Sequence, residues 1–298
     1  MSTAAGALPR RVELSAVAFR RLAWATVVML VLIVATGATV RLTGSGLGCE
    51  HWPGCTPHRF SPRGFHSDVE FGNRVVAAIT VGITLLLAVA SLFTRTLSRG
   101  MRALAWGTFL GTLAQAPLGA ITIHYGLNPY LVIAHLLLSL VVLGLGVMLA
   151  AAGPGAALPV RARQAAVVLL AAVAFLVVTG TLSTASGKFP GSSGDRYVQR
   201  LGAFQPSVAL HVKAVAAFGL LFLLLAAWAW RNRRRYGWLV RGCGGLLAIL
   251  AAQMAVGEAQ YRMYGTIPWW VVLLHVTLAA ALFAWTVGLV VRVWRPSH

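Results

Sequence analysis

Residues 22–43 read LAWATVVMLVLIVATGATVRLT, a long apolar run whose one charged residue, Arg41, lies near its end. About 20 apolar residues in a helix are enough to cross the hydrocarbon core of a bilayer, which is about 30 Å thick. The run is too long for the apolar core of a signal peptide, and no cleavage site ends it. We therefore expect residues 22–43 to be retained as a transmembrane helix.

Runs of the same kind recur to the end of the chain. Hydrophobic residues make up 58% of the 298 residues and charged residues only 10%, which is too little polar surface to coat a soluble protein. The runs also lack the alternation of barrel strands, and backbone groups in hydrocarbon must be paired within a helix or a closed barrel. The sequence therefore predicts an all-α polytopic membrane protein with eight transmembrane helices, at residues 22–43, 69–93, 103–123, 129–152, 163–184, 207–230, 239–259 and 269–291.

The formal net charge of +19 would suit a nucleic-acid-binding protein, but the arginines are scattered among helix ends and form no single patch. Most of them lie at one set of helix ends, which the positive-inside rule assigns to the cytoplasm. We therefore expect a multi-pass protein of the cell membrane with both termini cytoplasmic. Lipid is the expected partner of most of these cations, and nucleic acid is not an expected partner.

The two halves of the chain contain matching motifs in the same order. The matched pairs are Thr36-Gly37 with Thr179-Gly180, residues 115–119 with residues 253–257, and His135 with His275. Four predicted helices separate the members of each pair, so both halves keep the same orientation in the membrane. We therefore predict two pseudo-symmetric four-helix bundles side by side.

This repeat divides the chain into segments with different expected positions. They are a cytoplasmic N-terminal segment (1–21), a first bundle (22–152) with an outward loop (44–68), a cytoplasmic linker (153–162), a second bundle (163–291) and a cytoplasmic tail (292–298).

Two cysteines, Cys49 and Cys55, lie in the outward loop, where an oxidising environment permits a structural or redox-active disulfide. Two free thiols or a metal-binding pair remain alternatives. Cys243, near the cytoplasmic end of the seventh predicted helix, is expected to be a buried free thiol. A copper or zinc site could also be drawn through loop histidines, but we favour a solvated loop; these histidines are His51, His58 and His66.

Three histidines lie at a similar predicted depth, about 6 to 9 Å below the outer end of an even-numbered helix. They are His135, His211 and His275. Ionisable side chains are costly in hydrocarbon and generally face the protein interior, although a hydrogen-bonded packing role stays open for each. His211 and His275 fall in the same half, which suits two imidazoles that clamp a heme between neighbouring helices. A zinc site would need further ligands, and Glu258 is the only nearby acid in that half.

The first half offers a different set of side chains at the same depth. His135 lies opposite Asn73, and Glu70 lies one turn before Asn73 on the same helix face. Asparagine is a poor iron ligand, so this half would leave an iron less fully ligated beside a carboxylate. Glu70 is therefore a candidate catalytic residue that could move protons or stabilise a developing positive charge. A structural ion pair with Arg74 is the alternative.

Three motifs in this order resemble the signature of the heme A synthases. They are RLTGSGLGC at residues 41–49, WPGC at residues 52–55 and EFGNR at residues 70–74. The resemblance extends over nearly the whole chain, through the predicted spans and the histidines in helices four, six and eight. Many members have histidine where this chain has Asn73, so the chain resembles an actinobacterial type of member.

The resemblance implies oxidation of the C8 methyl group of heme O to a formyl group, which gives heme A for cytochrome oxidase. His211 and His275 would ligate the iron of a heme B cofactor. His135 would face the iron of the substrate heme, and Glu70 would be the catalytic carboxylate. Cys49 and Cys55 would be the outward cysteine pair.

Further residues and partners are expected for a protein of this kind. Asn73 is a tentative heme-pocket residue, and Arg41, Arg74 and Lys213 are candidates to contact heme propionates, with lipid as the alternative. Heme O synthase, a membrane electron donor and further copies of this chain are the expected partners. Two other functions stay open: a b-type membrane cytochrome that passes electrons from quinol, and a transporter built from parallel repeats.

Overall fold

The computed structural model describes residues 13–49, 51, 54–56, 62–151, 158–193 and 197–294. These residues form α1 (Ala16–Leu42), α2 (Phe65–Phe93), α3 (Arg99–His124), α4 (Pro129–Ala150), α5 (Val160–Ser186), α6 (Phe204–Arg231), α7 (Gly237–Arg262) and α8 (Trp269–Trp294). Ser45 and Ser192 form an isolated antiparallel bridge. The prediction of an all-α fold is confirmed, and each predicted apolar run falls on one of the eight helices.

Several helices begin before the predicted apolar runs, and in α1 and α3 a serine caps the first turn. The Ser15 Oγ accepts a hydrogen bond from the Ala18 N–H at 3.2 Å, and the Ser98 Oγ accepts one from the Met101 N–H at 3.2 Å. Such caps satisfy backbone donors that have no partner inside the helix. The first turns of α1 and α3 are therefore helical. They lay outside the predicted apolar runs because these turns contain arginines or lie next to them.

Seven of the eight helices are long and apolar enough to cross a membrane, which supports a multi-pass membrane protein. The exception is α3, which has sufficient length but a lower apolar content, because glycines, threonines, Gln115 and Pro117 occupy many of its positions. It still packs against both α2 and α4.

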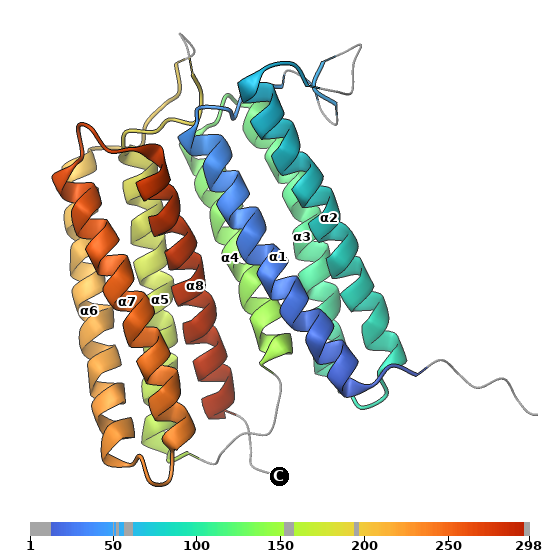
Figure 1. Cartoon of the computed structure of the whole chain (residues 1–298), viewed down its shortest axis with the longest axis vertical. Coiled ribbons are helices and arrows are strands. Elements are labelled where there is room, and N and C mark those ends of the chain that lie inside the picture. The colour runs from blue at the N-terminus through green and yellow to red at the C-terminus, as the bar shows by residue number, and fades with distance from the viewer. Residues whose placement is uncertain are drawn as a thin grey trace, which may run out of the picture.

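The helices form two groups, α1–α4 and α5–α8 (Figure 1). In the first group, α1 and α3 each contact both α2 and α4; in the second, α5 and α7 each contact both α6 and α8. Buried side chains such as Leu87 and Leu143 fill the first group, and Phe218 and Leu246 fill the second. The groups meet where α8 packs against α1 and α4, and where α5 packs against α4.

The loops that follow α1 and α5 lie against each other. The Gly46 N–H donates a hydrogen bond to the Gly191 carbonyl at 2.7 Å, beside the Ser45–Ser192 bridge. A Cβ atom on Gly46 would lie only 2.8 Å from that carbonyl oxygen, so this approach requires glycine. The contact joins the two groups of helices at the end that carries the 44–68 loop.

Candidate functional site

A cavity of about 710 Å³ opens among α1–α4 and reaches α5 and α8. Its volume is in the range of small-molecule and cofactor sites, and its wall is mostly apolar. The residues predicted for the first half all line this one cavity; they are Arg41, Glu70, Asn73, Arg74 and His135. The fold thus brings together side chains that are up to 94 positions apart in the sequence, which agrees with the similar depth predicted for them.

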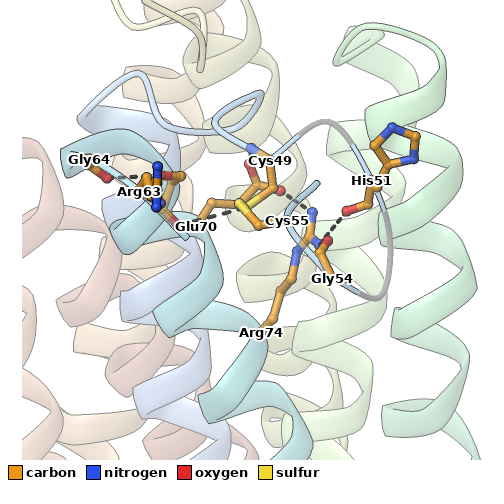
Figure 2. Close-up of a disulfide and its surroundings, with 9 residues drawn as sticks. Cys49, His51, Gly54, Cys55, Arg63, Gly64, Glu70 and Arg74 are labelled. Atoms are coloured by element: carbon orange, nitrogen blue, oxygen red, sulfur yellow. Dashed lines mark hydrogen bonds and ion pairs between the residues drawn. A yellow bond between two sulfur atoms is a disulfide. The ribbon is translucent and has the colours of Figure 1, made fainter. Parts of the chain in front are cut away.

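Glu70 is buried, and hydrogen-bond donors reach both of its carboxylate oxygens (Figure 2). The backbone N–H of Cys49 donates to Oε2 at 2.8 Å, and Arg74 Nη2 donates to Oε1 at 2.5 Å. The Glu70–Arg74 ion pair that the i,i+4 spacing allowed is therefore present. The same Glu70 lines the cavity, so the ion pair and a role toward a bound molecule are compatible.

A disulfide joins Cys49 and Cys55, which confirms the predicted pairing (Figure 2). The loop that it closes is tied to α2 by Arg74, whose Nη1 donates to the carbonyl oxygens of His51 and Gly54 at 2.7 and 2.6 Å. One guanidinium thus holds both the cysteine loop and the carboxylate of Glu70.

The loop histidines bear on the alternative of a copper or zinc site, as far as the structure describes them. Within these ranges no three His, Cys, Asp or Glu side chains are grouped as metal ligands. His66 instead forms a hydrogen bond of 3.0 Å with Ser45, and His58 lies outside the described residues. Cys243 is a buried free thiol, as predicted.

Asn73 is held in place from the neighbouring helix α1. The Thr36 Oγ1 donates to the Asn73 Oδ1 at 2.8 Å. The oxygen is the atom of the amide that could ligate a metal, because the amide nitrogen is a donor, and this oxygen already accepts a hydrogen bond. The Thr36 contact therefore supports the expectation that Asn73 is no substitute for an imidazole.

His135 lies across the cavity on α4. The side chain of Gln115 on α3 supports this turn of α4, because its Nε2 donates to the His135 carbonyl at 3.2 Å and to the Ser139 Oγ at 2.9 Å. The Nδ1 of His135 is buried and has no hydrogen-bond partner among the described residues. Its ring packs on Gly119, where an added Cβ would lie 3.5 Å from Cε1.

His211 and His275 face each other in the second group, with ring centres 6.5 Å apart and ring planes at 77°. A metal–nitrogen bond of about 2 Å on each side, plus about 1 Å from nitrogen to ring centre, would place two ligating rings roughly 6 Å apart. The Nδ1 of His211 is hydrogen-bonded to the Thr179 Oγ1 at 3.1 Å, which leaves Nε2 free to point at a metal. The pair therefore fits bis-histidine ligation of a heme.

Each histidine of this pair packs on a glycine of the preceding helix. An added Cβ would lie 3.1 Å from the ring of His211 at Gly180, and 3.1 Å from the ring of His275 at Gly257. These glycines belong to the motifs that repeat between the two halves of the sequence. The repeat thus marks the places where a helix must leave room for a ring.

The cations predicted to lie near the outer boundary have different surroundings. Arg41 lines the cavity and donates from Nη2 to the Thr184 carbonyl at 3.0 Å. Lys213 is exposed on α6 and is not part of the cavity wall. Arg200, in the segment before α6, lies close enough to Arg41 for the two charges to repel each other. Burial lowers the pKa of the Arg200 guanidinium from its ordinary value, and nearby Tyr264 opposes this shift.

Three residues of the site were not predicted to take part in it. In the sequence, Thr36 and Thr179 served only to mark the repeat. In the structure, Thr36 is hydrogen-bonded to Asn73 on α2, and Thr179 is hydrogen-bonded to His211 on α6. Their common motif was the available signal. Arg200 had no signal, since it lies in a polar segment outside the repeat.

Comparison with known proteins identifies relatives of the chain. A sequence model of the COX15-CtaA family, described as cytochrome oxidase assembly protein, matches residues 20–68 and 63–189. The heme A synthase of Geobacillus thermodenitrificans is 36% identical over 107 residues, which are 35% of this chain and 33% of that protein. The heme A synthase of Symbiobacterium thermophilum is 28% identical over 262 residues, which are 80% of this chain and 84% of that protein. The chain therefore matches about a third of the length of the first relative and most of the second.

Proposed function

The chain belongs to the COX15-CtaA family of cytochrome oxidase assembly proteins, and we propose that it is a heme A synthase that oxidises the C8 methyl group of heme O to a formyl group. The observation that carries this proposal is a cavity that presents a buried carboxylate, Glu70, together with His135. A carrier of electrons that holds its heme between His211 and His275 has no need for a large cavity with such a pair.

We propose that all eight helices, including α3, cross the cell membrane as two pseudo-symmetric four-helix bundles. The matching contact patterns of α1–α4 and α5–α8 support this arrangement. An even number of spans places both termini on the same side, and the arginine distribution favours the cytoplasm. In the second bundle the segment 163–291 would hold a resident cofactor, and in the first the segment 22–152 would hold the substrate.

His211 and His275 would hold the resident heme B, because their rings have the separation that bis-histidine ligation needs. When bound there, heme B supplies one-electron redox chemistry to the site. Thr179 fixes the His211 ring through Nδ1, and the glycine beside each ring leaves room for it without forcing the helices apart. The protein contribution in this half is thus ligation and rigid orientation.

His135 would ligate the iron of the substrate heme from one side of the first-half cavity, while Asn73 offers an amide on the other. A substrate must leave after reaction, and a single imidazole releases it more readily than two. The mostly apolar wall suits a macrocycle with a long hydrocarbon substituent.

Glu70 would act on the carbon that is oxidised. Its carboxylate is fixed by the Cys49 N–H and by Arg74, so its charge is oriented before the substrate enters. We propose that it stabilises positive charge at the methyl carbon and accepts the proton that this carbon loses. In this scheme water supplies the oxygen: each oxidation releases two electrons and two protons as water adds to the methyl carbon, which gives an alcohol and then a gem-diol. The gem-diol loses water to give the aldehyde, and the electrons pass to an acceptor in the membrane. A membrane redox partner exchanges the electrons, and heme O synthase supplies the substrate.

The experiment that tests this proposal expresses the chain with a heme O synthase in a host that makes no heme A. Extracted hemes are separated by chromatography and identified by mass. We expect heme A or its hydroxymethyl precursor with the intact chain and neither with Glu70→Ala. The matched control is Glu258→Ala, which removes an exposed acid with the same i,i+4 arginine pairing. Unchanged heme O beside a folded protein that binds heme B would instead favour a b-type cytochrome.

A further inference from the structure

Two arginines from different halves of the sequence lie together without an acidic partner among the residues that the structure describes. Arg41 is in the last turn of α1, and Arg200 lies between α5 and α6. Arg41 donates to the Thr184 carbonyl, and the N–H of Leu201, next to Arg200, donates to the adjacent Ala185 carbonyl at 3.3 Å. Both arginines thus lie at the same end of α5, close enough for their charges to repel each other. The salt bridges of the described residues all involve other arginines, namely Arg74, Arg95 and Arg262.

Both guanidinium groups have buried donors that remain unused. The Nε of Arg41 and the Nη2 of Arg200 are buried and have no hydrogen-bond partner among the described residues. A guanidinium keeps its proton in proteins, so it cannot escape burial by becoming neutral. Buried charges are normally paired, and two unpaired like charges side by side are costly. A bound anion would neutralise these charges and accept hydrogen bonds from the unused donors.

The surroundings of Arg41 indicate where this anion would come from. Arg41 lies in the wall of the first-half cavity, and it is anchored by the Thr184 carbonyl on α5. Helix α5 also carries Thr179, which holds the His211 ring. Arg41 thus lies at the seam between the two groups of helices, where the wall of the cavity reaches α5.

We propose that Arg41 and Arg200 together bind a carboxylate, and that this carboxylate is a propionate of a heme bound at the seam. This inference rests on the proposed function for the identity of the ligand. Arginine matches the planar geometry of a carboxylate through its fork of N–H donors. A propionate is a carboxylate on an otherwise apolar ring, which suits a mostly apolar cavity with cations at one edge. The site fixes the rotation of the ring about its axis, which iron ligands alone leave free.

The test compares two probes on the purified full chain prepared under heme limitation. One probe is hemin, and the other is hemin dimethyl ester, in which both propionates are esterified. We expect the intact chain to bind hemin at least about tenfold more tightly than the ester, because charge-assisted hydrogen bonds are worth about 1.5–3 kcal/mol. Equal affinities for the two probes would overturn the proposal, whatever the behaviour of any variant.

Variants locate the effect. Arg41→Gln and Arg200→Gln should each reduce the preference for hemin about tenfold while the affinity for the ester stays unchanged. Arg262→Gln, which removes an exposed arginine, is the matched control and should keep the full preference. A preference that persists undiminished in both site variants would overturn the assignment. If the glutamine variants do not fold, Arg41→Lys and Arg200→Lys take their place. These variants keep the positive charge and lose the fork of donors, so they should keep part of the preference for hemin.

Two further arms identify the source of the carboxylate and exclude a lipid. If the preference survives in His211→Ala protein, the propionate belongs to the heme in the first-half cavity; if it is lost, the propionate belongs to the resident heme. Binding of phosphatidylglycerol in nanodiscs that both arginine variants weaken, with hemin and ester bound alike, would assign the site to a phosphate and overturn the carboxylate. All readouts are binding spectra, so a failure of heme O oxidation would count against the proposed function alone.

Discussion

Replacing Arg74 by glutamine removes a guanidinium that donates to Glu70 at 2.5 Å and to the carbonyls of His51 and Gly54 at 2.7 and 2.6 Å. The side chains of Arg74 and Glu70 are only 15% and 5% exposed. Removing one partner of a buried ion pair costs about 3–5 kcal/mol, because the other charge is left uncompensated. Since Arg74 keeps some exposure and the Cys49 N–H still serves Glu70, we expect the lower end, a loss of about 3 kcal/mol in the free energy of unfolding.

The chain contains its own control for this prediction. Glu258 and Arg262 have the same i,i+4 spacing on a helix and a similar distance of 2.6 Å, but their side chains are 58% and 76% exposed. Exposed pairs of this kind contribute about 0.3–0.5 kcal/mol. Arg262→Gln should therefore change stability by no more than about 0.5 kcal/mol.

The measurement is a pair of double-mutant cycles in mixed micelles, with unfolding followed by the fluorescence of the 10 tryptophans. Glu70→Gln and Arg74→Gln form one cycle, and Glu258→Gln and Arg262→Gln form the other. We expect a coupling energy for the Glu70 pair that exceeds the other by at least about 2 kcal/mol. Coupling energies that agree within error would refute the reasoning, because they would mean that water reaches both pairs equally.

Three other perturbations test separate parts of the site. Gly180→Ala places a Cβ 3.1 Å from the His211 ring and should lower the heme B content or affinity about tenfold, as measured by pyridine hemochrome. The control is Gly219→Ala, whose added Cβ would have no atom within 4 Å and which should leave the heme B content unchanged. Asn73→His adds a second imidazole to the first-half cavity, so the absorption spectrum of a bound substrate heme should become low-spin. A larger fraction of this heme should also stay bound to the protein during gel filtration. An unchanged spectrum would count against an iron site shared by residues 73 and 135. Reduction of the disulfide should slow heme A formation without loss of heme B, because it loosens the loop whose N–H holds the carboxylate.

The fold was largely predictable because its main determinant, a run of about 20 apolar residues, is local in the sequence. The weakest prediction is the crossing of α3, whose glycines and Gln115 serve contacts with α4 and lower its apolar content. The helix ends were less predictable. Caps such as Ser15 and Ser98 extend helices into polar sequence, where an apolar criterion has nothing to detect.

The site was predictable in the facing positions of His211 and His275, because the repeat indicates their depth and their helices; their role as heme ligands stays a prediction. It was not predictable where a contact depends on the rotation of two helices about their axes. The Thr36–Asn73 hydrogen bond and the approach of Arg200 to Arg41 are of this second kind. No periodicity in a single sequence fixes such a rotation, because it is set by packing against neighbours distant along the chain.

The two threonine contacts also fix the register between the two halves and explain how one frame supports two kinds of site. Thr36 holds Asn73 and Thr179 holds His211, so Asn73 and His211 are equivalent positions. Counting three residues back from each gives Glu70 in the first half and Val208 in the second; counting one forward gives Arg74 and Val212. The second half therefore has apolar side chains at these two positions, beside two imidazoles that face each other. The first half exchanges one imidazole for an amide and adds a fixed carboxylate. This division supports a resident redox group in one half and a reacting, exchangeable substrate in the other, because chemistry at carbon needs the charged group and turnover needs the weaker ligation.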